Sequence, residues 1–240
     1  VLESPAAMHL ACEAQWLGQQ VGQLRDLDVI INDIVPKEAK AHPDLTGFDG
    51  LTEALGEHAK GVRQNLRDVL TGHRVQLFLF DLMKFVETRG WINVQDIGQT
   101  SRLATPVIHL AGAALRKRWK KTSKCAKGIQ DLSVEERHTL RKELKKLRYA
   151  AEFLAPIYPA KKVKPFLKSL KKLQDVFGDL NDAAMVKAIL IEHPLKAGIP
   201  KKVGVPIGWI AGASAARAEL HWDHAQQLWK RLRDTRALWS

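Results

Sequence analysis

The segment 133–154, SVEERHTLRKELKKLRYAAEFL, has the apolar spacing of an amphipathic helix. At about 100° per residue, one side of that helix collects Leu140, Leu144, Leu147, Ala151 and Leu154. The opposite side collects His138, Arg141, Lys142, Lys145, Tyr149 and Glu152, with Lys146 and Arg148 at its margins. Ser133 and Glu136 have the spacing of a capping box and predict where the helix begins. The segment therefore predicts a helix with a core face and a cationic face.

Helical spacing continues along almost the whole chain, and no run alternates in the strict period of two that a half-buried strand requires. The sequence therefore predicts an all-α fold. The expected helices cover about 6–21, 26–35, 51–70, 72–89, 102–122, 133–154, 162–177, 182–192 and 207–237. The expected irregular stretches are 36–50, 90–100, 123–132 and 193–206.

A short repeat links two distant parts of the chain. Residues 22–26, GQLRD, recur as GDLND at 178–182, each after a predicted helix and before an apolar run. We interpret both copies as tight corners, in which Gly22 and Gly178 are left-handed while Asp26 and Asp182 cap the next helix. The acidic pairs here could also hold Mg²⁺, but capping is the preferred interpretation, and we expect no metal and no cofactor. The repeat favours two similar helical halves.

Positive charge is concentrated in one quarter of the chain. The whole sequence has 38 Lys and Arg against 26 Asp and Glu, a net charge of +12. Counted from Arg116 to Lys172, 19 residues are basic and 5 are acidic, which leaves 19 basic and 21 acidic residues elsewhere. Such a local field favours a polyanion, namely nucleic acid, polyphosphate or acidic lipid headgroups. The alternative is a set of solvated lysine faces.

Two further basic stretches accompany the segment 133–154. In 162–177, a row of Lys164, Lys168, Lys171 and Lys172 lies opposite Leu167, Leu170, Leu173 and Phe177. A third concentration surrounds Trp119 and comprises Arg116, Lys117, Arg118, Lys120, Lys121, Lys124 and Lys127. We expect Trp119 to anchor the edge of the core. The basic rows contain almost no aromatic residues, which argues against a reader of single-stranded nucleic acid.

The residues HTLRKELKKLRYAAE at 138–152 and LQDVFGDLND at 173–182 resemble the second-half signature of the CHAD family, a helical domain named for its histidines. LRDLDV at 24–29 resembles the corner of the first half, and WKRLRDTRALW at 229–239 resembles the closing segment. The resemblance implies two four-helix bundles, related by internal duplication, around a basic cleft that binds inorganic polyphosphate. The halves would be 1–122 and 123–240. The first helix of the N-terminal half, which carries its own histidine, has no counterpart, because no basic residue lies near His9.

The resemblance places His138, Arg141, Lys142, Lys145, Arg148 and Tyr149 on the polyphosphate-binding face. The complete predicted site adds Lys164, Lys168, Lys171, Lys172, Arg116, Lys120 and Arg25. Arg148 is the member of the first set that the helical periodicity places only at the margin of the cationic face.

The function expected from the residues and the resemblance is non-catalytic binding of inorganic polyphosphate, because no nucleotide loop or catalytic arrangement of side chains occurs. The alternatives are an RNA- or DNA-binding helical module, or an accessory domain of a triphosphate-hydrolysing enzyme with a fused or associated CYTH domain. No apolar run approaches the length of a membrane span and no signal peptide is evident, so no membrane partner is expected. The expected location is the cytoplasm, at polyphosphate granules.

Overall fold

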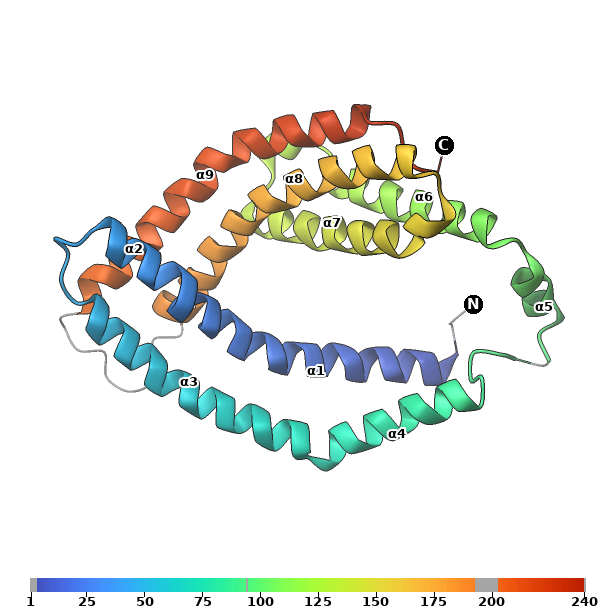
Figure 1. The fold of residues 1–240 in the computed structure, drawn as a ribbon, viewed down its shortest axis with the longest axis horizontal. Helices are drawn as coiled ribbons and strands as arrows, with labels where there is room; N and C mark the ends of the chain where they lie inside the picture. Colours follow the sequence, from blue (N-terminus) through green and yellow to red (C-terminus); the bar gives the residue numbers. More distant parts are fainter. Residues whose placement is uncertain (1–3, 94, 193–202, 240) are drawn as a thin grey trace. The chain divides into compact units, whose positions relative to one another are not determined.

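A computed structural model describes residues 4–93, 95–192 and 203–239 (Figure 1), and it contains helices and no strand within these ranges. The all-α prediction is confirmed. The N-terminal elements are α1 (Pro5–Val29), a π-helical segment (Ile30–Ile34), α2 (Val35–Ala41), α3 (Phe48–Thr71), α4 (His73–Glu87) and α5 (Ile97–Ala104). The later elements are α6 (Val107–Cys125), a 3₁₀ turn (Ile129–Asp131), α7 (Val134–Leu154), a 3₁₀ turn (Ala155–Ile157), α8 (Ala160–Val186), a second π-helical segment (Lys187–Glu192) and α9 (Gly204–Asp234).

Contacts between residues divide the chain into two compact units. Unit 1 comprises Val1–Ala104 and Lys187–Ile210, and unit 2 comprises Thr105–Val186 and Ala211–Ser240. This division differs from the expected halves 1–122 and 123–240, because α6 groups with α7 and α8. Each unit therefore combines segments that are distant in the sequence.

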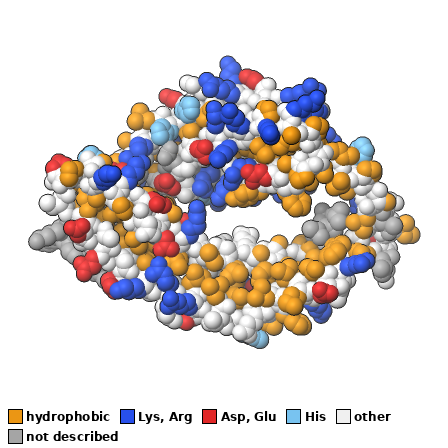
Figure 2. Space-filling view, viewed as in Figure 1, with side chains coloured by type: hydrophobic (Ala, Val, Ile, Leu, Met, Phe, Trp, Pro, Cys, Tyr) orange, Lys and Arg blue, Asp and Glu red, His pale blue; other side chains and the backbone are white. Residues whose placement is uncertain are grey.

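Unit 1 is built around α1, which packs against α3 and α4. Its buried side chains include Leu27, Ile30, Val35, Leu51 and Leu55. Helix α4 also presents apolar side chains that are exposed: Leu77, Leu79, Phe80, Met83 and Val86. Figure 2 shows hydrophobic side chains gathered over this part of the surface.

Unit 2 is a bundle of α6, α7, α8 and the part of α9 after Ile210. Helix α7 packs against both α6 and α8. The rings of Trp119 on α6 and Trp229 on α9 stack with centroids 5.5 Å apart, and the hydroxyls of Ser169 on α8 and Thr235 after α9 are 3.5 Å apart. The order around the bundle is therefore α6, α7, α8, α9, so the pairs α7–α8 and α6–α9 lie on opposite sides of the core.

The repeated GxLxD segments do not form corners, so this part of the sequence interpretation is wrong. Helix α1 runs through Gly22 and α8 runs through Gly178, and neither Asp26 nor Asp182 begins a helix. Glycine inside a helix costs only about 1 kcal/mol relative to alanine, which neighbouring residues that favour helix can offset. Among the described residues, the glycines with positive φ are Gly47 and Gly128.

The irregularity that follows each repeat is a π-helical segment farther along the chain. Each long helix passes through its GxLxD copy and then widens, at Ile30–Ile34 after α1 and at Lys187–Glu192 after α8. Both copies therefore occupy the same local setting, which supports an internal duplication of this segment.

Several predicted boundaries change. Residues 36–41 and 97–100 are helical although loops were expected there, and the predicted helix 102–122 is divided at Pro106, where the φ of proline suits the residue before a helix start. Of the irregular stretch predicted at 193–206, residues 193–202 lie outside the described residues, and 204–206 begin α9.

Candidate anion-binding site

Helix α7 begins as its sequence predicts. The side chain of Ser133 accepts a hydrogen bond from the backbone N–H of Glu136 at 3.2 Å, and the Glu136 carboxylate accepts one from the N–H of Ser133 at 2.8 Å. This capping box satisfies two amides that the first helical turn leaves without carbonyl partners. The 21 residues of α7 then continue with a fixed register, so its core face and its cationic face are set from its first residue.

The core face of α7 is confirmed by burial. The side chains that the spacing assigns to it and that are completely buried are Leu140, Leu144, Leu147 and Ala151. On the opposite side, Lys142 and Tyr149 are exposed, whereas His138, Arg141 and Lys145 are half-buried. The cationic face therefore points away from the core, as predicted.

One margin of α7, toward α6, is neutralised by an acid that the sequence interpretation did not place there. Glu143 is only 4% exposed, and its Oε1 lies 3.0 Å from Lys146 Nζ and 3.1 Å from Lys121 Nζ. Its Oε2 lies 3.9 Å from Arg118 Nη1. Burial raises the pKa of Glu143, but hydrogen bonds from Lys146 and Lys121 outweigh burial and hold the pKa below its usual value. The carboxylate of Glu143 thus partly neutralises these three cations.

The other margin of α7 faces α8. Helices α7 and α8 pack together and are joined only by residues 155–159, so they run antiparallel. On α8, Ser169 contacts the end of α9. The opposite flank of α8, which carries Lys171 and Gln174, therefore faces α7. Lys164, Lys168, Lys171 and Lys172 are all exposed, so the α8 row is confirmed as a solvent-facing row beside the cationic face of α7.

Two buried donors on these helices have no acceptor. The Nε of Arg148 and the Nε2 of Gln174 are buried without a hydrogen-bond partner in the described structure. The guanidinium of Arg148 reaches Glu152 only through Nη1, at 3.5 Å. A buried N–H without an acceptor costs roughly 1–3 kcal/mol. Both donors lie on the helix pair that carries the lysine rows.

Six lysines on the solvent-facing sides of α7 and α8 have no acidic partner among the described side chains. Within the part of the chain whose side chains are described, no ion pair is formed by Lys142, Lys145, Lys164, Lys168, Lys171 or Lys172. Figure 2 shows Lys and Arg side chains gathered over the helices of unit 2. We call these six lysines, with His138 and Arg141, the α7–α8 face.

The surroundings of His138 lower its pKa. Burial lowers the pKa of the His138 imidazole, and the charges of Lys142 and Arg141 lower it further. The imidazole is therefore neutral at pH 7 and can take up a proton when an anion offsets the neighbouring charges.

Three predicted site residues lie elsewhere. Arg116 and Lys120 share a side of α6 that differs from the side of Arg118 and Lys121, which contact Glu143 of α7. Burial raises the pKa of the Tyr158 phenol, and the positive charge of Arg116 partly offsets that rise. Arg116 and Lys120 thus do not share the side of α6 that contacts Glu143, and their role in binding stays a prediction.

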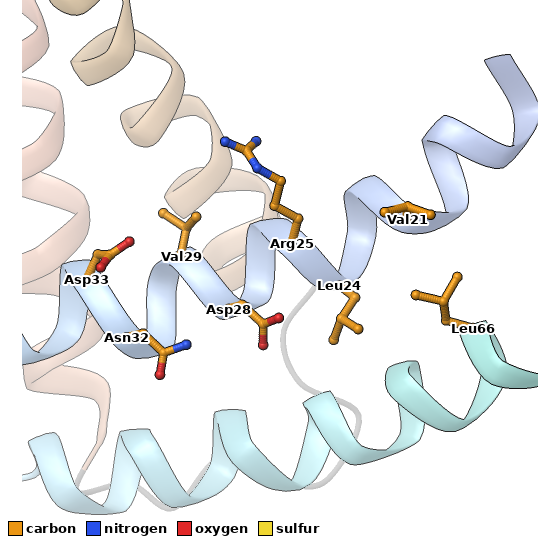
Figure 3. A pocket seen from close by; sticks show the side chains of 8 residues that line it. All are labelled: Val21, Leu24, Arg25, Asp28, Val29, Asn32, Asp33 and Leu66. Atoms are coloured by element: carbon orange, nitrogen blue, oxygen red, sulfur yellow. The ribbon is translucent and has the colours of Figure 1, made fainter. Parts of the chain in front are cut away.

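Arg25 belongs to unit 1, where it lines a cavity of about 310 Å³ with Asp28 and Asp33. Figure 3 shows Arg25 and Asp28 pointing to different sides of α1. Asp28 accepts a hydrogen bond from Arg63 Nη2 at 3.1 Å. The carboxylates make the surroundings of Arg25 less favourable for a polyanion than those of the α7–α8 face.

Two exposed aromatic side chains lie beside the cationic face, although almost none were expected among the basic rows. Tyr149 is 53% exposed and Phe153, one turn farther along α7, is 83% exposed. The guanidinium carbon of Arg148 lies 5.1 Å from the centroid of the Tyr149 ring. The i, i+4 spacing of these two aromatics was visible in the sequence and could have identified them.

Neither a metal centre nor a membrane span is found in the described residues. No group of three or more His, Cys, Asp or Glu side chains there could hold a metal ion. None of the described helices combines the length and apolar character needed to cross a bilayer.

Comparisons with known proteins agree with this architecture. The sequence profile of the CHAD domain family matches residues 1–190. The crystal structure of the CHAD domain from the plant Ricinus communis superposes with a TM-score of 0.77 at 22% sequence identity, over 98% of this chain and 74% of that chain. No match was found among the curated proteins. Because the family profile covers most of the sequence and the folds agree, the chain belongs to the CHAD domain family.

Proposed function

We propose that unit 2 binds inorganic polyphosphate through the α7–α8 face and does not cleave it. The observation that carries this proposal is the set of lysines on two adjacent helices that form no ion pair among the described side chains, next to two buried donors without acceptors. CHAD domains are associated with polyphosphate binding, which agrees with this choice of polyanion. We infer no catalytic step, because the described side chains of the face are cations and hydrogen-bond donors without an arranged nucleophile and base.

The physical basis is charge matching along a line. A linear polyphosphate carries about one negative charge per phosphate, and lysines one helical turn apart can each approach a different phosphate as adjustable point charges. Arg141 and Arg148 can offer paired donors to phosphate oxygens. Counterion release then contributes to affinity and makes binding depend strongly on salt, as it does for nucleic acids.

Chain length provides the first test. Each linked phosphate raises the effective concentration of the next, so long chains are expected to bind far more tightly than orthophosphate. Titrations with polyphosphates of graded length measure this directly. Equal affinity for orthophosphate and for the long polymer would exclude the proposed face-wide binding.

A single-stranded nucleic acid is the second candidate, because Tyr149 and Phe153 are exposed beside the cationic face and could stack on bases. Stacking is worth about 1–3 kcal/mol per base, whereas polyphosphate has nothing to stack. The variant Phe153→Ala should therefore weaken binding of a polyuridine strand by about fivefold or more if RNA is the ligand. The proposal for polyphosphate predicts that the variant binds long polyphosphate as the wild type does.

We further propose that this binding recruits the protein to polyphosphate granules. A polyanionic granule also concentrates any cationic protein, so net charge must be held constant in the test. Neutralising Lys142, Lys145, Lys168 and Lys171 while adding four lysines elsewhere keeps the net charge of +12. A fluorescent fusion of this variant should leave the granules. A fusion that remains on them would show that bulk charge alone drives recruitment.

A further inference from the structure

A second cluster of cations lies on the opposite side of unit 2, around a cavity between the end of α6 and α9. The cavity has a volume of about 530 Å³ and is lined by Lys127, Lys230 and Arg233, with Trp229 at its base. Trp229 is only 4% exposed and belongs to the core cluster of the bundle. The inner wall of this cavity is thus fixed by the packing of the helices.

The charges around this cavity are not balanced. Its lining contains no carboxylate, and Lys127, Lys230 and Arg233 form no ion pair among the side chains that the structure describes. This differs from the margin of α7, where the carboxylate of Glu143 engages three cations. Three unneutralised cations around one cavity create a local field that favours an anion of high charge.

Polar side chains complete the lining. Gln130 and Gln227 lie at the cavity, and their amides can donate hydrogen bonds to oxygen atoms as well as accept them. Arg233 can present two parallel donors to a phosphoryl group, and the lysines can adjust to its remaining oxygens. The donors therefore match an oxyanion with several oxygens rather than a simple halide or a carboxylate.

The size and position of the cavity separate it from the α7–α8 face. A volume of about 530 Å³ lies within the range of roughly 300–1,000 Å³ that small-molecule sites occupy. The cavity lies between α6 and α9, whereas the α7–α8 face belongs to the other pair of the bundle, with the hydrophobic core between them. A ligand here would contact the side chains of one hollow, whereas the lysines of the α7–α8 face are distributed along two helices.

We infer that this cavity is a separate binding site for a small phosphoryl anion, formed by Lys127, Lys230 and Arg233. The recognised group is a short phosphate chain. Its source is either inorganic, as in tripolyphosphate, or a nucleotide such as ADP, whose base would meet the glutamine amides. This site does not depend on polyphosphate binding at the α7–α8 face.

The test uses calorimetric titration of the whole chain with inorganic tripolyphosphate and, separately, with ADP. The cavity variant Lys127→Gln, Lys230→Gln, Arg233→Gln should bind the preferred probe at least tenfold more weakly than wild type, because hydrogen bonds to charged groups contribute about 1.5–3 kcal/mol each. The control Lys37→Gln, Arg67→Gln, Lys84→Gln removes the same charge from exposed positions of unit 1 and should bind as wild type does. The tighter probe identifies the source of the phosphate.

Two further variants separate this site from the α7–α8 face. Gln227→Trp narrows the cavity without changing its charge and should weaken the same probe. Lys142→Gln, Lys145→Gln, Lys168→Gln, Lys171→Gln should leave that probe within threefold of wild type, and the cavity variant should still retain long polyphosphate. The inference is overturned if neither probe binds, if the cavity variant binds like wild type, or if the α7–α8 variant loses the probe equally.

Discussion

Neutralising lysines of the α7–α8 face should change both the affinity for long polyphosphate and its salt dependence. The perturbation is Lys142→Gln, Lys145→Gln, Lys168→Gln and Lys171→Gln, of which Lys145 is half-buried and the others are exposed. For single strands, each neutralised phosphate contributes about 0.7 to the slope of log K against log salt. Four lost contacts should therefore reduce the slope by about 3.

The same slope sets the loss of affinity. If the variant and the wild type bind equally near 1 M salt, where the electrostatic contribution vanishes, a slope difference of about 3 corresponds to roughly a thousandfold weaker binding at 0.1 M salt. Because the lysines carry no ion pair among the described residues, their replacement should change the free energy of unfolding by less than about 0.5 kcal/mol per site.

The assay is a titration of long polyphosphate by fluorescence anisotropy at several salt concentrations, with thermal unfolding measured in parallel. The matched control is Lys37→Gln, Lys40→Gln, Arg67→Gln, Lys84→Gln, which removes the same charge from exposed side chains of unit 1. The control should keep at least nine tenths of the wild-type slope. The reasoning is refuted if control and face variants lose equal affinity, since net charge would then account for binding.

The remaining predictions concern α7. Burial and neighbouring cations lower the pKa of His138, whereas a bound polyanion raises it, so the affinity for long polyphosphate should increase as the pH falls from 8 to 5. The variant His138→Gln should flatten this pH profile. A profile that the variant leaves unchanged would show that His138 is not part of the site. Glu143→Gln should destabilise the chain by about 1 kcal/mol at pH 7, and since the pKa of Glu143 is lowered, the difference should disappear as acid titrates the wild-type carboxylate through that pKa. Leu144→Ala should cost about 2–5 kcal/mol in denaturant unfolding, because Leu144 is completely buried; a loss below 1 kcal/mol would contradict the assigned core face. Ser133→Ala should cost about 1 kcal/mol through the lost cap, and Ser133→Asp should restore it.

The sequence was most informative where local rules act within one helix. The capping box at Ser133 and the leucine spacing of α7 depend only on residues three or four positions apart, so both could be predicted and both are confirmed. The corners at Gly22 and Gly178 were wrong because glycine permits a left-handed turn without requiring one. The π-helical segments that follow escaped prediction because a single wide turn leaves the apolar period on either side almost unchanged.

Features that depend on neighbouring helices could not be predicted in the same way. Glu143 is buried because Lys121 of α6 and Lys146 reach its carboxylate, and the pairing of α6 with α7 cannot be inferred from the periodicity of α7 alone. The cavity at Lys127 and Lys230 joins residues about one hundred positions apart, which become neighbours only when α9 packs against α6. The exposed Phe153, in contrast, lies at a local spacing of four residues from the predicted Tyr149 and was overlooked.

The central claim is that polyphosphate binds on the α7–α8 face, and amide chemical-shift mapping by NMR tests it most directly. The isotopically labelled chain is titrated with long polyphosphate at moderate salt, and the shift of each assigned amide is followed. The account predicts that the largest changes cluster in residues 138–149 of α7 and 164–174 of α8, with α3 and α4 unaffected. Shifts concentrated around Arg25 in unit 1, or spread evenly over all basic surfaces, would contradict it.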